Sequence, residues 1–172
     1  MDDLLDMARI SKGRIELRRS RVDLNELMRQ AADDFRSLGT PANLRIEVHG
    51  APQPLWLHAD AARITQVIGN LLHNAIKFTP GGGLIELSTR LGDGFAVLEV
   101  VDSGAGMDAS QLARIFEPHS RSLHSPMHAK AGLGLGLSLV RGLVEMHEGS
   151  VNATSAGPGL GSAFRLKFPI AR

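Results

Sequence analysis

The longest periodic segment of the chain, residues 61–78, constrains the fold more than any other feature. Six apolar residues recur there at helical spacing and predict a long helix with one buried face. They are Ile64, Val67, Ile68, Leu71, Leu72 and Ala75. Asp60 stands at the expected N-cap, and the sequence Thr-Pro-Gly-Gly-Gly from residue 79 ends the helix.

The remaining segments predict further helices and several strands. Helices are expected at 2–12, 22–38 and 108–116 and after residue 132; strands are expected at 14–19, 44–48, 54–60, 84–91, 95–102, 150–156 and 162–170. Asp23 with Glu26 predicts a capping box, Asp108 a second N-cap, and Trp56 a core position. The Gly-Asp-Gly turn at 92–94 indicates a hairpin. Strands and helices do not alternate as βαβ units, so we expect an α+β, two-layer sandwich with a mixed, mostly antiparallel sheet and helices on one face.

Composition narrows the chemistry. The 172 residues include no cysteine, which excludes disulfides, thiolate zinc sites and cysteine nucleophiles. The formal net charge of +1 favours neither nucleic acid nor a membrane as a partner. His119, His124 and His128 could suggest a metal site on a helix, but Pro126 argues against that helix. The basic residues between Arg9 and Arg21 could contact nucleic acid, but they are interpreted as a solvated face or a surface that meets another domain.

Two asparagines lie on one face of the predicted 61–78 helix. Asn70 and Asn74 are one turn apart, and Lys77 follows on nearly the same face. One interpretation is a pair of hydrogen-bonded or solvated amides. The other is an oxygen ligand set for a hard cation such as Mg²⁺, with the lysine neutralising phosphate oxygens.

Two glycine-rich segments add further candidates. Asp102 ends an apolar strand and is followed by Gly104 and Gly106, which fits either a turn or a carboxylate at the mouth of a pocket. The sequence Gly132-Leu-Gly-Leu-Gly-Leu-Ser138 precedes a helix, where free N–H groups favour anions. It lacks the preceding strand and the G-x-G-x-x-G spacing of a dinucleotide-binding turn.

The order of these motifs resembles one known family. The patterns N-x-x-x-N-A-x-K-F, D-x-G-x-G-M, I-F-E-P and G-x-G-L-G-L-S are similar to the N, G1, F and G2 boxes of the sensor histidine kinase ATP-binding domain. That domain belongs to the GHKL superfamily, with gyrase B, a heat-shock chaperone and the MutL mismatch-repair protein. The resemblance implies the Bergerat ATP-binding fold, with ATP and Mg²⁺ as cofactors.

The resemblance also implies roles for individual residues. Asn74 would be the Mg²⁺ ligand, Asn70 and Lys77 would lie beside the phosphates, and Asp102 would accept a hydrogen bond from the adenine amine. Phe116 would anchor a lid at 117–131. The other implied nucleotide-binding positions are Gly104, Gly106, Met107, Gly132, Leu133, Gly134, Gly136 and Leu137. ATP-hydrolysing relatives carry a glutamate where this chain has Asn70. A glutamate can accept a proton from an attacking water, whereas an asparagine cannot.

A catalytic fragment is the function that the resemblance implies. Residues 1–13 would be the tail of a dimerisation helix and residues 14–172 the catalytic domain. The γ-phosphoryl group would go to a histidine on a dimerisation domain outside this chain, and then to a response regulator receiver domain. His147, before Glu148, is interpreted as structural rather than as that acceptor. The resemblance implies a cytoplasmic location, whether or not the parent protein is anchored in the inner membrane. The alternative is a nucleotide-binding regulatory module of the same fold without kinase activity.

Overall fold

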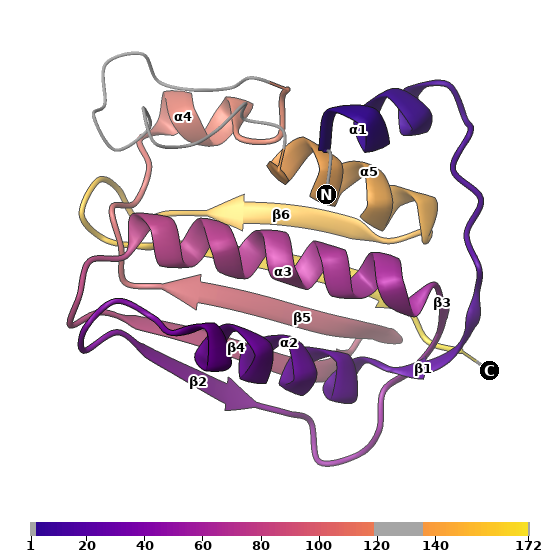
Figure 1. Cartoon of the computed structure of the whole chain (residues 1–172), viewed down its shortest axis with the longest axis horizontal. Coiled ribbons are helices and arrows are strands. Elements are labelled where there is room, and N and C mark those ends of the chain that lie inside the picture. The colour runs from indigo at the N-terminus through magenta and orange to yellow at the C-terminus, as the bar shows by residue number, and fades with distance from the viewer. Residues whose placement is uncertain (1–2, 119–135, 172) are drawn as a thin grey trace.

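The computed structural model describes residues 3–118 and 136–171. One sheet has the strand order β2-β4-β5-β7-β6 (Figure 1). Its strands are β2 (Arg45–His49), β4 (Leu84–Gly92), β5 (Phe95–Asp102), β6 (Ser150–Thr154) and β7 (Ser162–Pro169). The β2–β4 pair is parallel and the other three pairs are antiparallel. The predicted α+β class with a mixed, mostly antiparallel sheet is therefore confirmed.

Three helices cover one face of this sheet: α2 (Leu24–Leu38), α3 (Ala61–Phe78) and α5 (Gly136–Met146) (Figure 1). The six apolar residues predicted for the buried face of α3 are all buried. Two shorter helices, α1 (Asp3–Ser11) and α4 (Ala109–Arg114), lie outside this layer. Among residues 3–118 and 136–171, no helix has both the length and the apolar character needed to cross a bilayer.

A separate two-stranded sheet corrects two predictions. Strand β1 covers Ser20–Asp23, not 14–19, and pairs antiparallel with β3 (Trp56–Ala59). The alternation at 14–19 suggests a strand, but a strand needs a partner to form hydrogen bonds with. All four residues of β3 are already paired with Ser20–Asp23. Trp56 is 37% exposed, because Leu57 and Ala59 occupy the inward positions of β3. The Arg21 guanidinium lies 4.5 Å from its ring centroid instead.

The predicted N-caps at Asp60 and Asp108 and the predicted hairpin turn are confirmed, whereas the predicted capping box at Asp23 is not. Asp60 accepts hydrogen bonds from two backbone N–H groups of α3, and Asp108 forms a capping box with Gln111. Asp23 caps α2, but its carboxylate binds the N–H of Asn25, so the predicted box with Glu26 does not form. In the β4–β5 turn, Asp93 and Gly94 both have positive φ, as a type I′ hairpin requires.

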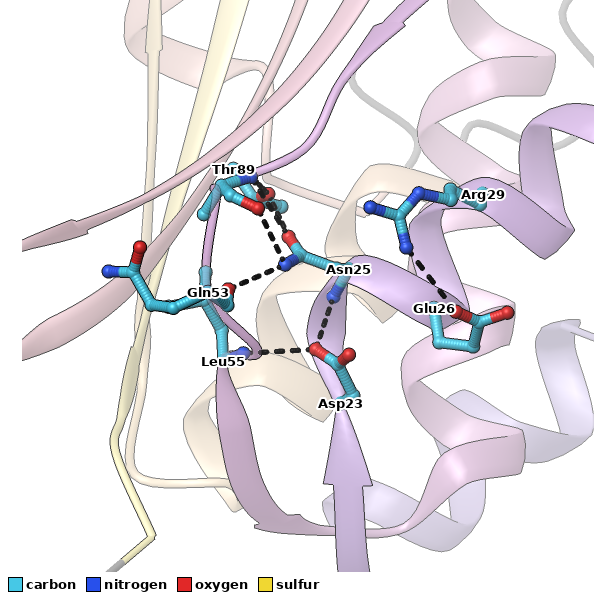
Figure 2. Close-up of polar contacts among 8 residues, drawn as sticks. Asp23, Asn25, Glu26, Arg29, Gln53, Leu55 and Thr89 are labelled. Atoms are coloured by element: carbon cyan, nitrogen blue, oxygen red, sulfur yellow. Dashed lines mark hydrogen bonds and ion pairs between the residues drawn. The ribbon is translucent and has the colours of Figure 1, made fainter.

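A buried amide fixes the start of α2 (Figure 2). The Asn25 Nδ2 donates to the carbonyls of Ala51 and Gln53 at 3.2 and 2.9 Å. Its Oδ1 accepts from the Ala51 N–H at 3.2 Å and from the Thr89 hydroxyl. Since every bonding direction of this side chain is used, the network ties α2, β4 and the 50–55 connection together without an orphaned polar group.

Candidate nucleotide site

The first part of the candidate site joins α3 to the start of α5. Asn70 Nδ2 donates to the carbonyl oxygen of Gly136 at 3.3 Å. Asn74 and Lys77 follow along α3, half-buried. Gly136 begins α5, as the Gly-rich sequence predicts, and Leu137 and Ser138 are buried in its first turn. Asn70 therefore lies against the first residue of α5, and the N-terminal end of a helix generally favours an anion.

The second part is a buried carboxylate at the end of β5. Asp102 is 7% exposed, and one of its oxygens accepts a hydrogen bond from the Gly104 N–H at 2.9 Å. Desolvation by burial raises the pKa of this carboxyl, although the backbone N–H groups of Gly104 and Ser162 oppose that rise. An ionised carboxylate is a strong acceptor for any hydrogen-bond donor placed beside it.

Glycines let the turn after Asp102 contact its neighbours closely. A Cβ on Gly104 would lie 2.2 Å from the carbonyl oxygen of Phe78, the last residue of α3. The next N–H, that of Ala105, donates to the same oxygen at 2.9 Å. The turn is therefore fastened to the end of α3, which brings Asp102 into one region with the helix that carries Asn70 and Lys77.

Phe116 and Met107 both pack into the hydrophobic core. Phe116 follows α4 and packs edge-on against Phe164 of β7, with ring centroids 6.1 Å apart. Met107 is 7% exposed and belongs to the hydrophobic core. Phe116 thus fixes the chain to the core at the point where the expected lid would begin.

Some predicted positions lie outside the described residues. They are Gly132, Leu133 and Gly134 of the glycine-rich segment, residues 119–131 of the expected lid, and the three histidines between 119 and 128. Within the described part of the chain, one group of side chains could hold a metal: Glu47, His49 and Glu86. It lies on β2 and β4, on the side of the sheet opposite the helices, and is unrelated to the predicted Asn74 ligand.

His147 lies at the C-terminal end of α5, where both of its ring nitrogens are used. Nδ1 lies 2.7 Å from the Leu143 carbonyl oxygen, and Nε2 accepts from the Asp60 N–H at 3.1 Å. These partners fix the Nδ1–H tautomer. The side chain is 4% exposed, and burial lowers its pKa. Because its nucleophilic nitrogens are occupied, this geometry supports a structural role.

Comparison with known proteins identifies the family. A family model described as "Histidine kinase-, DNA gyrase B-, and HSP90-like ATPase" matches residues 59–172. This chain belongs to that family. The sensor histidine kinase TmoS of Ectopseudomonas mendocina is 33% identical over 99% of this chain and 17% of its own length. Full-length ShkA in complex with AMPPNP is 31% identical, with a TM-score of 0.81 over 98% of this chain and 35% of that one.

The mycobacterial sensor histidine kinase MprB is 26% identical, with a TM-score of 0.75, and the match covers 88% of this chain and 97% of that one. The chain spans about a fifth of the length of TmoS and of the LuxQ sensor kinases that it matches. The chain therefore contains a domain of this family and matches only part of the length of these relatives.

The site fits the nucleotide that this family binds, ATP. Thr79 Oγ1 is the one buried side-chain polar atom without a hydrogen-bond partner among the described residues. It lies 2.9 Å from the place that a Gly104 Cβ would occupy, beside the Asp102 turn. An orphaned hydroxyl of this kind calls for a partner from a ligand or water. In the sequence, Thr79 is interpreted only as the start of the segment that ends the 61–78 helix, so it is not a candidate site residue there.

Proposed function

We propose that this domain transfers the γ-phosphoryl group of ATP to a histidine on a separate dimerisation domain. The observation that carries the proposal is the convergence of three segments far apart in sequence. The Asn70–Gly136 hydrogen bond joins α3 to α5, and the Phe78–Ala105 hydrogen bond joins α3 to the Asp102 turn. A nucleotide needs contacts to its base and to its phosphates in one place, and this convergence would bring the candidate residues for both together.

Each residue would act by position and charge. Asp102 would accept a hydrogen bond from the adenine amine, and Lys77 with the α5 N-terminus would neutralise phosphate oxygens. Asn74 would be the side chain that holds Mg²⁺, with the bound ion neutralising charge on the triphosphate when present. Asn70 cannot act as a general base toward water, so the pocket would preserve ATP for an incoming imidazole.

The start of the chain would connect this domain to its phosphoacceptor. We propose that residues 1–13 are the tail of the dimerisation helix and that 14–172 is the catalytic domain. In support, Asp6 in α1 is buried and pairs with Arg63 at 3.3 Å and with Gln66 at 3.1 Å, both in α3. The domain would work in the cytoplasm, where ATP is supplied, with a response regulator as the final phosphate acceptor.

Two measurements test this function. Calorimetry with ATP should show binding that strengthens when Mg²⁺ is added, whereas a regulatory module without catalysis need not show that metal linkage. Mixing the chain with Mg-ATP and the histidine-bearing domain of the same parent should then label a histidine on that domain. Absence of nucleotide binding at millimolar concentration would refute the proposal, and metal-linked binding without histidine labelling would favour the regulatory module.

A further inference from the structure

The loop between β6 and β7, residues 155–161, is not used by the function proposed above. Its sequence is Ser-Ala-Gly-Pro-Gly-Leu-Gly, and Gly157, Gly159 and Gly161 all have positive φ. Such a backbone is rarely accessible to other residues, so the loop has a specific shape rather than a variable one.

Three hydrogen bonds join this loop to the turn that carries Asp102. The Gly159 N–H donates to the Ala105 carbonyl at 2.7 Å, and the Gly161 N–H donates to the Gly104 carbonyl at 3.1 Å. The third runs from the Met107 N–H to the Ser155 hydroxyl oxygen at 3.0 Å. The turn is thus held along its length by the 155–161 loop.

The Ser155 hydroxyl connects both ends of its own loop to the turn. Besides the Met107 N–H, its oxygen accepts the Gly157 N–H at 3.3 Å. It donates to the Gly161 carbonyl, the nearer of two carbonyl oxygens, at 2.7 Å. A single side-chain oxygen therefore organises the loop start, the loop end and residue 107.

The two segments are also in direct backbone contact. A Cβ on Gly106 would lie 2.2 Å from the Gly157 carbonyl oxygen, and one on Gly161 would lie 2.1 Å from the Asp102 carbonyl oxygen. Asp102 is moreover paired with Ser162 in the β5–β7 register. The loop and the turn are packed without space between their backbones, so a movement of one segment requires a movement of the other.

We propose that Ser155 is a positioning residue for adenine recognition: its hydroxyl sets the 102–107 turn and thereby aims the Asp102 carboxylate at the base. This inference rests on the proposed nucleotide-binding function. Ser155 acts through the turn. Its loss therefore reduces the contact that Asp102 makes and leaves the phosphate contacts of α3 and α5 in place.

The test compares ATP with inosine triphosphate, which lacks the exocyclic amine of adenine. Calorimetry of the full chain with Mg²⁺ is done for wild type, Ser155→Ala and Ser155→Thr, which keeps a hydroxyl. We expect Ser155→Ala to weaken ATP binding about tenfold, because the proposed hydrogen bond between Asp102 and the adenine amine would be lost. Inosine triphosphate binding should change less than threefold, and Ser155→Thr should restore most of the ATP affinity.

Controls separate positioning from general stability. Thr154→Ala removes a neighbouring exposed hydroxyl on β6 and should leave both affinities unchanged. In an Asp102→Asn background, Ser155→Ala should add little further loss for ATP, because both changes act on one contact. If Ser155→Ala does not fold, Ser155→Cys keeps the shape with a weaker acceptor and should show the same selective loss.

Two results would overturn the inference: ATP binding of Ser155→Ala equal to wild type, or equal losses for ATP and inosine triphosphate. Failure of the wild-type chain to bind ATP would instead refute the proposed function, so the two failures are distinguishable.

Discussion

The carboxamide of Asn70 in α3 donates a hydrogen bond to the carbonyl oxygen of Gly136, the first residue of α5, across 3.3 Å and 66 positions of sequence. An amide donor is needed for this bond, so the asparagine has a structural role at the start of α5 as well as its proposed place beside the phosphates. This hydrogen bond explains why α3 carries Asn70 at a half-buried position, although asparagine has poor helix propensity.

Replacing Asn70 by aspartate removes the donor while keeping the size. A carboxylate oxygen would then face the Gly136 carbonyl oxygen, at a cost of about 1–3 kcal/mol. We expect hydrogen exchange of the first α5 amides to become faster even without nucleotide, and Mg-ADP affinity to fall at least tenfold. Asn152→Asp makes the same change at an exposed position of β6 and should do neither. Unchanged exchange in Asn70→Asp would contradict this.

Replacing Asn70 by glutamate introduces a group that can accept a proton from water. We expect phosphate release from Mg-ATP, measured without any histidine domain, to rise about tenfold or more, since general bases contribute 10² or more when well placed. Asn70→Gln is the matched control because it has the same length without basicity. Equal water turnover in the two variants would show that position 70 does not decide between water and histidine.

Asp102→Asn should weaken nucleotide binding and change the pH dependence of stability. Asparagine can keep the Gly104 bond, but its NH₂ then faces the donor on the base, so ATP affinity should fall about tenfold to a hundredfold. Burial raises the pKa of Asp102, so the folded state favours the protonated form. Its stabilising contribution is therefore present below the unfolded pKa and is lost as pH rises through the folded pKa.

Urea unfolding of wild type and Asp102→Asn between pH 3 and 8 checks this sign. The unfolding free energy of the variant relative to wild type should increase as pH rises, because the variant has no buried charge to desolvate. Asp93→Asn, in the exposed hairpin turn, should show no such trend. A difference that is constant with pH would mean that Asp102 titrates normally in the folded protein.

His147→Gln should remove an acid-sensitive step in stability. Burial lowers the pKa of His147, so its contribution is present above the unfolded value of 6.5 and is lost as pH falls through the folded value. Glutamine offers a donor for the Leu143 carbonyl and an acceptor for the Asp60 N–H without titrating. Wild type should lose more unfolding free energy than the variant between pH 8 and 5; His73→Gln, exposed on α3, should behave as wild type. Phosphate found on His147 after incubation with ATP would contradict its structural role.

The predictions that succeeded from sequence rest on short-range chemistry. The buried face of α3 follows from its 3.6-residue period, and the Asp60 and Asp108 caps follow from side chains that reach the next backbone N–H groups. The failures involve partners. Residues 14–19 alternate like a strand, but no strand pairs with them within the described part of the chain. Trp56 faces outward because Leu57, its neighbour on β3, occupies an inward position.

The candidate site residues also differ in whether local sequence or distant contacts point to them. Asn70, Asp102 and the glycines could be proposed as site residues from the sequence, because amides in a helix and glycines after a carboxylate are locally unusual. Thr79 and Ser155 could not, because each is an ordinary residue whose proposed role depends on distant atoms: Gly104 for the first, Met107 and Gly161 for the second.

The amino-acid sequence alone determined most of the elements, the caps at Asp60 and Asp108, and the order of four motifs that resemble nucleotide-binding boxes, since these depend on periodicity and on contacts within a few residues. Only the tertiary structure shows that Asn70 contacts Gly136, that the Asp102 turn is hydrogen-bonded to the end of α3, and that the 155–161 loop is hydrogen-bonded to that turn. These contacts join segments separated by tens of residues, and only the packed sheet and helices bring them within hydrogen-bond distance.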